Sequence, residues 1–574
     1  MAYVLATNIT SPLGMTTAAN YQAVKAKRSA LRRYEGLWGL PEPCTASLFT
    51  DEQRHAMAID GLTRFESLVV YSVQEALAQL NIDIAAKNVC FILSTTKANV
   101  ELLDSIGCEP GPTIYPGETA QRIAHHLGFT TSPIVVCNAC ISGVAAIILA
   151  QRLLDGGCYD YAVVCGADVQ NRFTVSGFQS LKAVSADDCR PFDMERNGLN
   201  LGEAAATMVL CGRQKQGGIP MASEDEGRDR TQCLPIIEYG VIRNDAFHIS
   251  SPSKNGEGAW LALRDLDVDV NHTAFINAHG TATMFNDQME SVAIERAGLN
   301  PIPVNGLKGY YGHTLGAAGV LETVISLTAL RDHTILSTRG FEERGVSGKI
   351  CITAENADTD KTTFVKMISG FGGCNAAITV SASALPNSPV IPRSPIIPTH
   401  RVTLTPTTAT VGGQPLSSSN LTALYKTFVG DYPKYYKMDG LSRLGFIATE
   451  LLLQAEGEER FQKCDDRAVV LMGSSSSIDV DKKYMETIAA DNFFPSPSLF
   501  IYTLPNIVTG EIAMRNLYHG ETSFYLLPER NEKTEKELIL ATLQDKKVKS
   551  VITGWIDYYD ENNYMADLSI VAKQ

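Results

Sequence analysis

The sequence predicts an α/β protein whose sheets are covered by helices on both faces. Apolar, strand-like runs at residues 88–94, 132–137 and 161–166 alternate with helical stretches at residues 62–80 and 144–155. That order of elements is typical of α/β folds. The strand runs do not alternate apolar and polar residues, as strands with one exposed face would. We therefore expect a layered fold with doubly covered sheets.

Length and composition indicate a globular protein with more than one folded unit. The chain has 574 residues, and a domain usually takes about 100–200 of them. Apolar residues make up 45% and charged residues 20% of the chain. These fractions are ordinary for a globular protein and differ from those of disordered or fibrous chains.

The net charge and the cysteine content indicate which cellular compartment the protein occupies and which classes of partner it can bind. No apolar run reaches the roughly 18 residues of a membrane span, and residues 1–7 read as a buried strand and not as a signal peptide. Thirteen cysteines without an export signal indicate reduced thiols. We expect a cytoplasmic protein that binds no membrane. The net charge of −14 argues against nucleic acid as a partner, because phosphate binding needs a basic surface.

A proline-rich stretch divides the chain. Between Leu385 and His400, prolines occur at every third position, which matches the turn of a polyproline II helix. Such a segment acts as a stiff spacer of about 3.1 Å per residue. We therefore place a first unit at residues 1–385, a linker at residues 386–400 and a second unit at residues 401–574.

The second unit repeats part of the first. Residues 59–65 (IDGLTRF) recur as residues 438–444 (MDGLSRL), and each phrase precedes a helix and then a strand. The strands correspond too: residues 89–95 to 469–475, 161–167 to 550–555, and 207–212 to 569–574. Nothing in the copy corresponds to residues 240–385, so the second unit is predicted to be half of the first.

Three glycine-flanked phrases carry the candidate chemistry. They contain Cys140 in VVCNACISG, His279 in NAHGTAT and His313 in GHTLGAAG. Small neighbours let a backbone or a thin ligand arm approach each side chain closely. The two histidines stand beside glycine and threonine in loop-like phrases, whereas a structural histidine usually lies in a periodic apolar run. We interpret the three residues as one acyl-transfer site.

Cys140 is the candidate nucleophile. It follows a strand and precedes the helix at 144–155, where free N–H groups of a helix N-terminus are expected to lower the thiol pKa. Two other interpretations stay open: a buried core thiol, or a Cys-x-x-Cys redox or metal pair with Cys137. No second cysteine pair with ligand spacing follows, so we predict no metal. The segment that corresponds to Cys140 in the copy, residues 528–534, holds no cysteine.

These phrases together resemble the β-ketoacyl-acyl carrier protein synthases, condensing enzymes of the thiolase superfamily, in the branch with a Cys-His-His site. The resemblance covers residues 1 to about 385. Further phrases that carry it are NDAFHISSP at 244–252, CRPFD at 189–193, GE at 202–203 and SGFGG at 369–373. It implies the layered α-β-α-β-α thiolase-like fold for the first unit. The inert second unit then resembles part of a chain-length factor, a half-thiolase α/β domain.

The resemblance also implies roles for the three residues. Cys140 would take an acyl chain from a phosphopantetheine thioester. His279 and His313 would promote decarboxylation of malonyl-carrier protein and stabilise the enolate. The backbone N–H groups of Cys140 and Phe371 would hold the tetrahedral oxyanion.

Other matched positions are assigned in the same way. Lys308 and Glu322 match an ion pair that organises the histidine loop, with an ordinary surface salt bridge as the alternative. Thr281 and Thr283 match positions that hydrogen-bond the pantetheine arm. The positions that match a gating loop and its neighbour are Phe371, Gly372, Gly373, Asp245 and His248.

Two positions depart from the family pattern. Cys374 stands where the family usually has threonine, and Ala204 stands where it has glycine. Degradative thiolases use Cys-His-Cys and initiating synthases use Cys-His-Asn, so His313 argues against both. Cys374 nevertheless keeps a thiolase-type acyltransferase open as an alternative.

The resulting expectation is a β-ketoacyl-acyl carrier protein synthase that extends an acyl chain by decarboxylative Claisen condensation. The pathway would be fatty-acid or polyketide/polyene-type biosynthesis, with no metal or organic cofactor beyond the carrier's phosphopantetheine. Acyl carrier protein is the expected partner, in a homodimer or in a heterodimer with another ketosynthase-like subunit. The alternative is a scaffold or chain-length-factor-like partner of another ketosynthase. Because a lone half-unit would leave an apolar face exposed, we expect residues 401–574 to pack against the first unit or another subunit.

Overall fold

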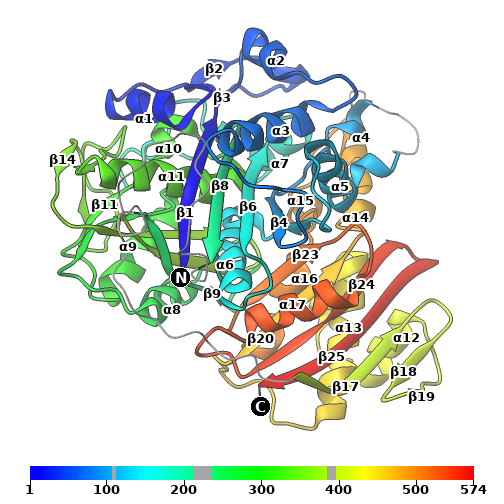
Figure 1. Ribbon diagram of the computed structural model, residues 1–574. Coiled ribbons are helices and arrows are strands. Elements are labelled where there is room, and N and C mark those ends of the chain that lie inside the picture. The colour runs from blue at the N-terminus through cyan, green and yellow to red at the C-terminus, as the bar shows by residue number, and fades with distance from the viewer. Residues whose placement is uncertain (106–110, 213–233, 384–395, 490–491, 574) are drawn as a thin grey trace.

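The computed structural model describes residues 1–105, 111–212, 234–383, 396–489 and 492–573 (Figure 1). Within those ranges no helix combines the length and the apolarity that a membrane crossing requires. The first unit contains two sheets and the second unit a third. The helices that cover them are α1 (Thr17–Lys25), α2 (Asp51–Met57), α3 (Arg64–Leu77), α5 (Pro116–Leu127), α6 (Ser142–Asp155), α7 (Arg172–Ser180), α8 (Glu257–Leu266), α9 (Met284–Arg296), α11 (Ala318–Arg331), α12 (Leu421–Phe428), α13 (Gly440–Glu456), α14 (Ile478–Thr487), α15 (Pro497–Tyr502), α16 (Ile507–Asn516) and α17 (Glu532–Thr542).

The two sheets of the first unit have mixed strand directions. In the first sheet the strand order is β5-β4-β6-β8-β1, with β1 (Ala2–Thr10), β4 (Val89–Ser94), β5 (Ile134–Val136), β6 (Tyr161–Asp168) and β8 (Ala204–Gly212). In the second sheet the order is β13-β11-β10-β15-β16-β9, with β9 (Ile236–Asn244), β10 (Thr273–Asn277), β11 (Pro303–Asn305), β13 (Cys351–Ile352), β15 (Thr363–Gly370) and β16 (Cys374–Ser381).

The first unit has five layers. Helices α6 and α11 lie between the two sheets and contact both, α3 covers the outer face of the first sheet, and α8 covers the outer face of the second. Every residue of α6 from Ser142 to Leu154 is buried, as expected for a helix that is apolar all round. The predicted layered α-β-α-β-α fold is confirmed.

The second unit repeats the topology of the first sheet. Its strand order is β23-β20-β24-β25-β17, with the same parallel and antiparallel pairings as β5-β4-β6-β8-β1. The strands are β17 (Ile396–Leu404), β18 (Ala409–Val411), β20 (Arg467–Gly473), β23 (Thr522–Leu526), β24 (Ser550–Asp560) and β25 (Asn563–Lys573). The duplication extends to a buried carboxylate: Asp168 accepts hydrogen bonds from the loop after β4, and Asp557 from the loop after β20.

The second unit begins earlier than the sequence predicted. Strand β17, the counterpart of β1, starts at Ile396, inside the predicted linker at 386–400. Pairing with β25 places this segment in an extended sheet strand and not in a polyproline II helix. Pro398 fits there because β17 carries exposed positions, where a missing N–H is tolerated. The rest of the predicted linker, residues 386–395, lies outside the described residues.

The two units share a continuous sheet. Strand β5 pairs antiparallel with β23, joining Val136 to Tyr525 and Val135 to Leu526. Helix α6 contacts α17 beside this junction, and Figure 1 shows the second unit lying along one side of the first. A further subunit cannot pair with this edge of β5, because β23 occupies it. The predicted homodimer or heterodimer would therefore have to form through a different surface, and it stays a prediction.

Buried ion pairs accompany the junction. Arg152 on α6 contacts Glu521 at 2.6 Å, Arg243 on β9 contacts Asp545 at 2.8 Å, and Lys97 contacts Asp481 at 2.6 Å. Burial alone would disfavour the Arg152 charge, but Glu521 and Asp545 raise the pKa of Arg152 above its ordinary value. Removing one member of such a pair leaves a buried charge without a partner.

The face of the second unit that has no covering half is less apolar than we expected. In the first sheet, Met208 and Leu210 of β8 are buried and lie in one apolar cluster with α6 and α11. On β25, Asp567 instead holds bidentate hydrogen bonds from exposed Arg401 and an ion pair with Arg530. A polar, paired surface needs no apolar cover, so the expectation of an exposed apolar face was wrong at these positions. The expected packing of the second unit against the first is confirmed by the pairing of β23 with β5.

The buried ion pairs between the two units should contribute far more to the free energy of unfolding than ion pairs at the surface. Arg152→Ala leaves Glu521, which is fully buried, without its partner, so we expect the free energy of unfolding to fall by about 3–5 kcal/mol. Arg401→Ala is the control, because Asp567 keeps Arg530 and an exposed pair contributes about 1 kcal/mol or less. Chemical denaturation of both variants would test this, and equal losses would contradict it.

Candidate active site

Cys140 is displayed at the end of β5. After Val136 the chain forms a short 3-10 turn over Ala139–Ile141 and enters α6 at Ser142. Ala139 has a φ of 49°, a left-handed conformation that residues other than glycine rarely adopt. This turn projects the thiol away from the strand and leaves Cys140 partly accessible, whereas Cys137 is buried.

His313 occupies a matching place before α11. A 3-10 turn over Leu315–Ala317 separates it from that helix. The two helices touch through glycines: a Cβ on Gly143 would lie 2.9 Å from the Gly319 Cα, and a Cβ on Gly319 would lie 2.4 Å from the Val144 nitrogen. Only glycine permits this approach, which brings the segments before both helices together.

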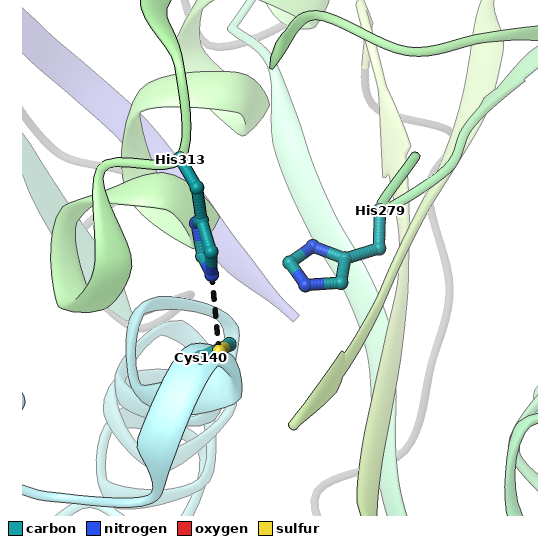
Figure 2. A group of neighbouring side chains, drawn as sticks. All are labelled: Cys140, His279 and His313. Carbon is teal, nitrogen blue, oxygen red and sulfur yellow. Dashed lines mark hydrogen bonds between the residues drawn. The ribbon is translucent and has the colours of Figure 1, made fainter. Parts of the chain in front are cut away.

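The structure brings the three predicted residues together. His313 Nε2 lies 3.0 Å from Cys140 Sγ, and the rings of His279 and His313 are 4.9 Å apart at 82°. Figure 2 shows the His279 ring turned toward the other two side chains from the loop that follows β10. The candidate ligand atoms of the three residues all lie within 4.8 Å of one another.

Hydrogen bonding fixes the tautomer of His313. The backbone N–H of Leu315 donates to His313 Nδ1 at 3.3 Å. An Nδ1 that accepts leaves the proton of the neutral ring on Nε2. Nε2–H therefore donates to the sulfur of Cys140, and in this tautomer that nitrogen has no lone pair to offer a metal ion.

Two carboxylates hold the His279 loop, and the sequence analysis missed both. Glu290 accepts the backbone N–H groups of His279 and Gly280 at 2.7 and 2.8 Å, and Asp287 accepts that of Thr281 at 2.9 Å. Burial and then Asp287 raise the pKa of Glu290 to about 7. Their spacing of three residues on α9, directly after the HGT phrase, is a signal that could have identified them.

A buried charge cluster underlies the histidines. Glu322 contacts Lys308 at 2.6 Å, as predicted, and also Lys366 at 2.5 Å, which was not predicted. All three side chains are buried, so this is not the surface salt bridge that the sequence left as an alternative. Burial disfavours the Glu322 charge, but the two lysines hold its pKa below the usual range. A single lysine within the apolar strand run FVKMIS was the available signal for Lys366.

Both imidazoles are neutral at physiological pH. Burial lowers the pKa of His279 and His313 well below the ordinary value, and the positive charges of Lys308 and Lys366 lower both further. The positive charges of Lys308 and Lys366 therefore disfavour protonated histidine and favour a negative charge that forms nearby.

The prediction of a lowered thiol pKa was wrong. Burial raises the pKa of Cys140 to about 12, although Lys308 and the backbone N–H groups of Cys140 and Phe371 act in the opposite direction. The helix begins at Ser142, so the N-terminal effect is present and is outweighed by desolvation. At neutral pH Cys140 is therefore a thiol that accepts a hydrogen bond from His313.

The predicted oxyanion donors lie near the sulfur. The backbone N–H groups of Cys140 and Phe371 both act to lower the pKa of the Cys140 thiol. Phe371 lies in the turn between β15 and β16, and its ring stacks on Phe178, with 6.2 Å between the ring centroids. Two N–H groups near one point suit a negative charge that develops on a substrate oxygen bound there.

The remaining predicted residues, apart from His248, lie around this centre. Thr281 and Thr283 share a hydrogen bond of 2.9 Å beside His279. Asp245 supports the loop from outside: its carboxylate accepts from Ser253 and Gly258, and its N–H bonds to the Gly373 carbonyl. His248 is exposed and accepts from the Ser250 N–H, so the structure does not bring its side chain to Cys140.

Both departures from the family pattern are buried. The Cys374 thiol hydrogen-bonds to the Phe371 and Asn138 carbonyls at 3.2 and 3.7 Å, and is 1% exposed. It therefore faces backbone behind the loop, whereas the thiol of Cys140 is partly accessible. Ala204 starts β8 opposite Asp168 and is also buried.

Two protein-family models match the chain. Residues 16–216 match the model described as beta-ketoacyl synthase, N-terminal domain, and residues 235–342 match beta-ketoacyl synthase, C-terminal domain. The chain belongs to the β-ketoacyl synthase family. The two matches lie within the first unit and include Cys140, His279 and His313.

Sequence relatives agree with that assignment. The chain is 33% identical over 285 residues to 3-oxoacyl-[acyl-carrier-protein] synthase 2 of Rhizobium meliloti (strain 1021), covering 47% of this chain and 65% of the relative. It is 30% identical over 280 residues to a putative mitochondrial 3-oxoacyl-[acyl-carrier-protein] synthase of Schizosaccharomyces pombe, covering 45% and 63%. The chain thus spans less than two thirds of the length of these curated relatives.

Solved structures share the fold. PfaC Keto synthase-Chain length factor aligns with 100% of this chain and 78% of its own, with a TM-score of 0.78 and 16% identity. The ketosynthase ApeO, solved in complex with its chain length factor ApeC from Xenorhabdus doucetiae, aligns with 67% of this chain and 98% of its own, with a TM-score of 0.54 and 23% identity. The first of these likenesses includes the second unit. At such identities the likeness is one of fold.

The raised thiol pKa predicts how Cys140 reacts with an alkylating agent. The thiolate is the reactive form, so with a pKa of about 12 the rate should rise about tenfold per pH unit between pH 7 and 10. Iodoacetamide labelling, read at the Cys140 peptide by mass spectrometry, would measure this. Exposed Cys351 serves as the internal control. A plateau for Cys140 near neutral pH would contradict the prediction.

Proposed function

We propose that the chain is a β-ketoacyl-acyl carrier protein synthase, an acyltransferase that performs decarboxylative Claisen condensation. The observation that carries the proposal is the assembled triad, with Cys140 Sγ 3.0 Å from His313 Nε2 and the His279 ring beside both. The substrates would be an acyl thioester and malonyl thioester on acyl carrier protein. The names of the sequence relatives support this substrate class.

The first step would transfer the acyl chain to Cys140. The sulfur attacks the thioester carbonyl, a carbon–sulfur bond forms to Cys140, and the bond to the carrier's pantetheine breaks. The proton of the Cys140 thiol passes to the departing pantetheine sulfur. The backbone N–H groups of Cys140 and Phe371 would donate to the substrate oxygen as it acquires charge, and one such donor is worth about 3–4 kcal/mol.

The second step would form the new carbon–carbon bond. Malonyl thioester loses carbon dioxide, and the electron pair of the broken bond becomes an enolate. Neutral imidazoles can donate Nε2–H to the thioester oxygen that carries this charge. The enolate carbon attacks the acyl-enzyme, and the Cys140 sulfur leaves as a thiolate and regains a proton. Lys308 and Lys366 favour the anionic stages, because both place positive charge close to the histidines.

The proposal includes no metal and no cofactor other than the carrier's phosphopantetheine. Thr281 and Thr283 would bind the pantetheine arm, and the turn at Phe371 would border the acyl group. The pathway would be fatty-acid or polyketide/polyene-type biosynthesis in the cytoplasm. A scaffold or chain-length-factor-like role would explain why the second unit has no cysteine in the segment that corresponds to Cys140. It would not explain a complete triad in the first.

Loss of the thiol should abolish acyl transfer. Incubation with acyl-carrier protein should add one acyl group to the intact mass of the wild-type chain, and Cys140→Ala should show no addition. Cys374→Ala is the matched control and should acylate, because its thiol faces backbone carbonyls. Acylation that survives in Cys140→Ala would overturn the assignment.

The histidines should separate the two steps. His279→Ala removes a donor to the enolate oxygen but leaves Cys140 and His313 in contact, so acylation should persist while condensation falls at least about a hundredfold. His313→Ala should slow both steps, because it also bonds to the sulfur. Carbon dioxide release from malonyl-carrier protein would report the second step. Normal chain extension by His279→Ala would contradict the mechanism.

A further inference from the structure

Three large apolar side chains lie together on the surface of the first unit. Met284 and Phe285 begin α9 and are 57% and 76% exposed, and Met194 is 56% exposed. Arg196 holds the two segments together, because its guanidinium donates to the Asp193 carbonyl at 2.9 Å and to the Met284 carbonyl at 3.4 Å. Neighbouring exposed apolar side chains are typical of surfaces that bind another molecule. We call Met194, Met284 and Phe285 the α9 patch.

The α9 patch lies at the outer end of the loop that carries His279. Along this loop the side chains become more exposed from one residue to the next. His279 and Thr281 are buried, and Thr283 is half-buried. Met284 and Phe285 follow directly and are exposed. The loop therefore leads from the chemical centre to the surface of the protein.

A buried carboxylate fixes the α9 patch relative to the site. Asp287 of α9 is fully buried and accepts backbone N–H groups from Thr281 at 2.9 Å and from Phe192 at 2.7 Å. One carboxylate thus joins the His279 loop to the segment that leads to Met194. Substitution of an exposed patch residue leaves these bonds in place, so the patch can be altered without altering the site.

The charged side chains beside the α9 patch are paired with one another. Glu195 follows Met194 directly. Arg190 contacts Glu195 and Glu342, each at 3.0 Å. The patch therefore offers a partner apolar area more than net charge. Contact with it would depend on the apolar area that becomes buried and little on salt, which weakens interactions between exposed charges.

We propose that the α9 patch is the surface on which the acyl carrier protein docks, through apolar contact. A thioester that reaches Cys140 past Thr283 is attached to a pantetheine arm whose other end leaves the site at Met284. The protein that bears this arm then lies over the patch, and its own apolar surface would cover Phe285. The inference rests on the proposed function, because it takes the carrier as the donor of the acyl group.

The test compares the double variant Met284→Ser/Phe285→Ser with Phe494→Ser. Exposed positions tolerate serine, so the variants should fold, and thermal unfolding would verify this. Phe494 is the matched control, because it is 81% exposed and lies between α14 and α15 of the second unit, which Figure 1 shows well away from α9. Acylation of Cys140 is followed by intact mass with two donors, octanoyl-acyl carrier protein and octanoyl-pantetheine. Isothermal titration calorimetry measures the Kd for the carrier.

The double variant should lose activity with the carrier and keep it with pantetheine. With octanoyl-acyl carrier protein, kcat/KM should fall about tenfold, and the carrier Kd should rise about tenfold, because apolar contact is lost. With octanoyl-pantetheine, kcat/KM should match wild type, since Cys140 and both threonines of the loop are unchanged. The wild-type Kd should change less than about threefold between 0.05 and 0.5 M sodium chloride. Phe494→Ser should match wild type throughout.

Equal losses with the two donors would overturn the proposal, because the α9 patch would then act on the site itself. An unchanged carrier Kd in the double variant, an equal loss in Phe494→Ser, or a larger effect of salt on the wild-type Kd would overturn it too. Sedimentation would identify a second copy of the chain as the occupant, if the double variant lost self-association and kept its carrier Kd, and that result would also contradict the proposal.

The binding measurement separates this inference from the proposed function. It needs the carrier but no acyl transfer. If wild type bound the carrier and accepted an acyl group from neither donor, the proposed function would fail, while the comparison of Kd values still decided the role of the α9 patch.

Discussion

The contact between Gly143 and Gly319 is the constraint on which the site depends. Packed helices usually keep their axes about 8–10 Å apart, because side chains fill the space between them. Here the starts of α6 and α11 meet backbone to backbone, with no room for a Cβ on either side. Cys140 lies just before one helix and His313 just before the other, so the crossing point of the helices and the chemical centre coincide. The glycine-flanked phrases are therefore packing features as much as catalytic ones.

Burial gives this site its electrostatic character. Desolvation keeps the thiol and both imidazoles neutral, while Lys308 and Lys366 place positive charge close to the two histidines. Negative charge then appears only when a substrate reacts, and the preorganised donors meet it without reorganisation. If the Cys140 thiol were ionised before substrate bound, its negative charge would already occupy the position where the substrate's negative charge has to form.

The sequence was sufficient for the parts that lie within short phrases. The triad and the half copy could be predicted because each shows as a local pattern or a repeat, and the Lys308–Glu322 pair could be predicted because the phrases around it resemble those of the family. The pKa of Cys140 could not, since its direction depends on burial by segments far apart in the chain. The polar face around Asp567 was missed because its partners, Arg401 and Arg530, come from separate segments.

The strand pairing that joins the two units also has a consequence for synthesis. Asn138 Oδ1 accepts from the Phe524 N–H across this junction, and 386 residues separate the two. At about 5–20 residues per second, a ribosome needs roughly 20–80 s to make that stretch. During this interval β5, the strand that leads to Cys140, has an open edge, and open edges recruit other strands. The open edge of β5 can be covered by β23 only after the ribosome has made the last third of the chain.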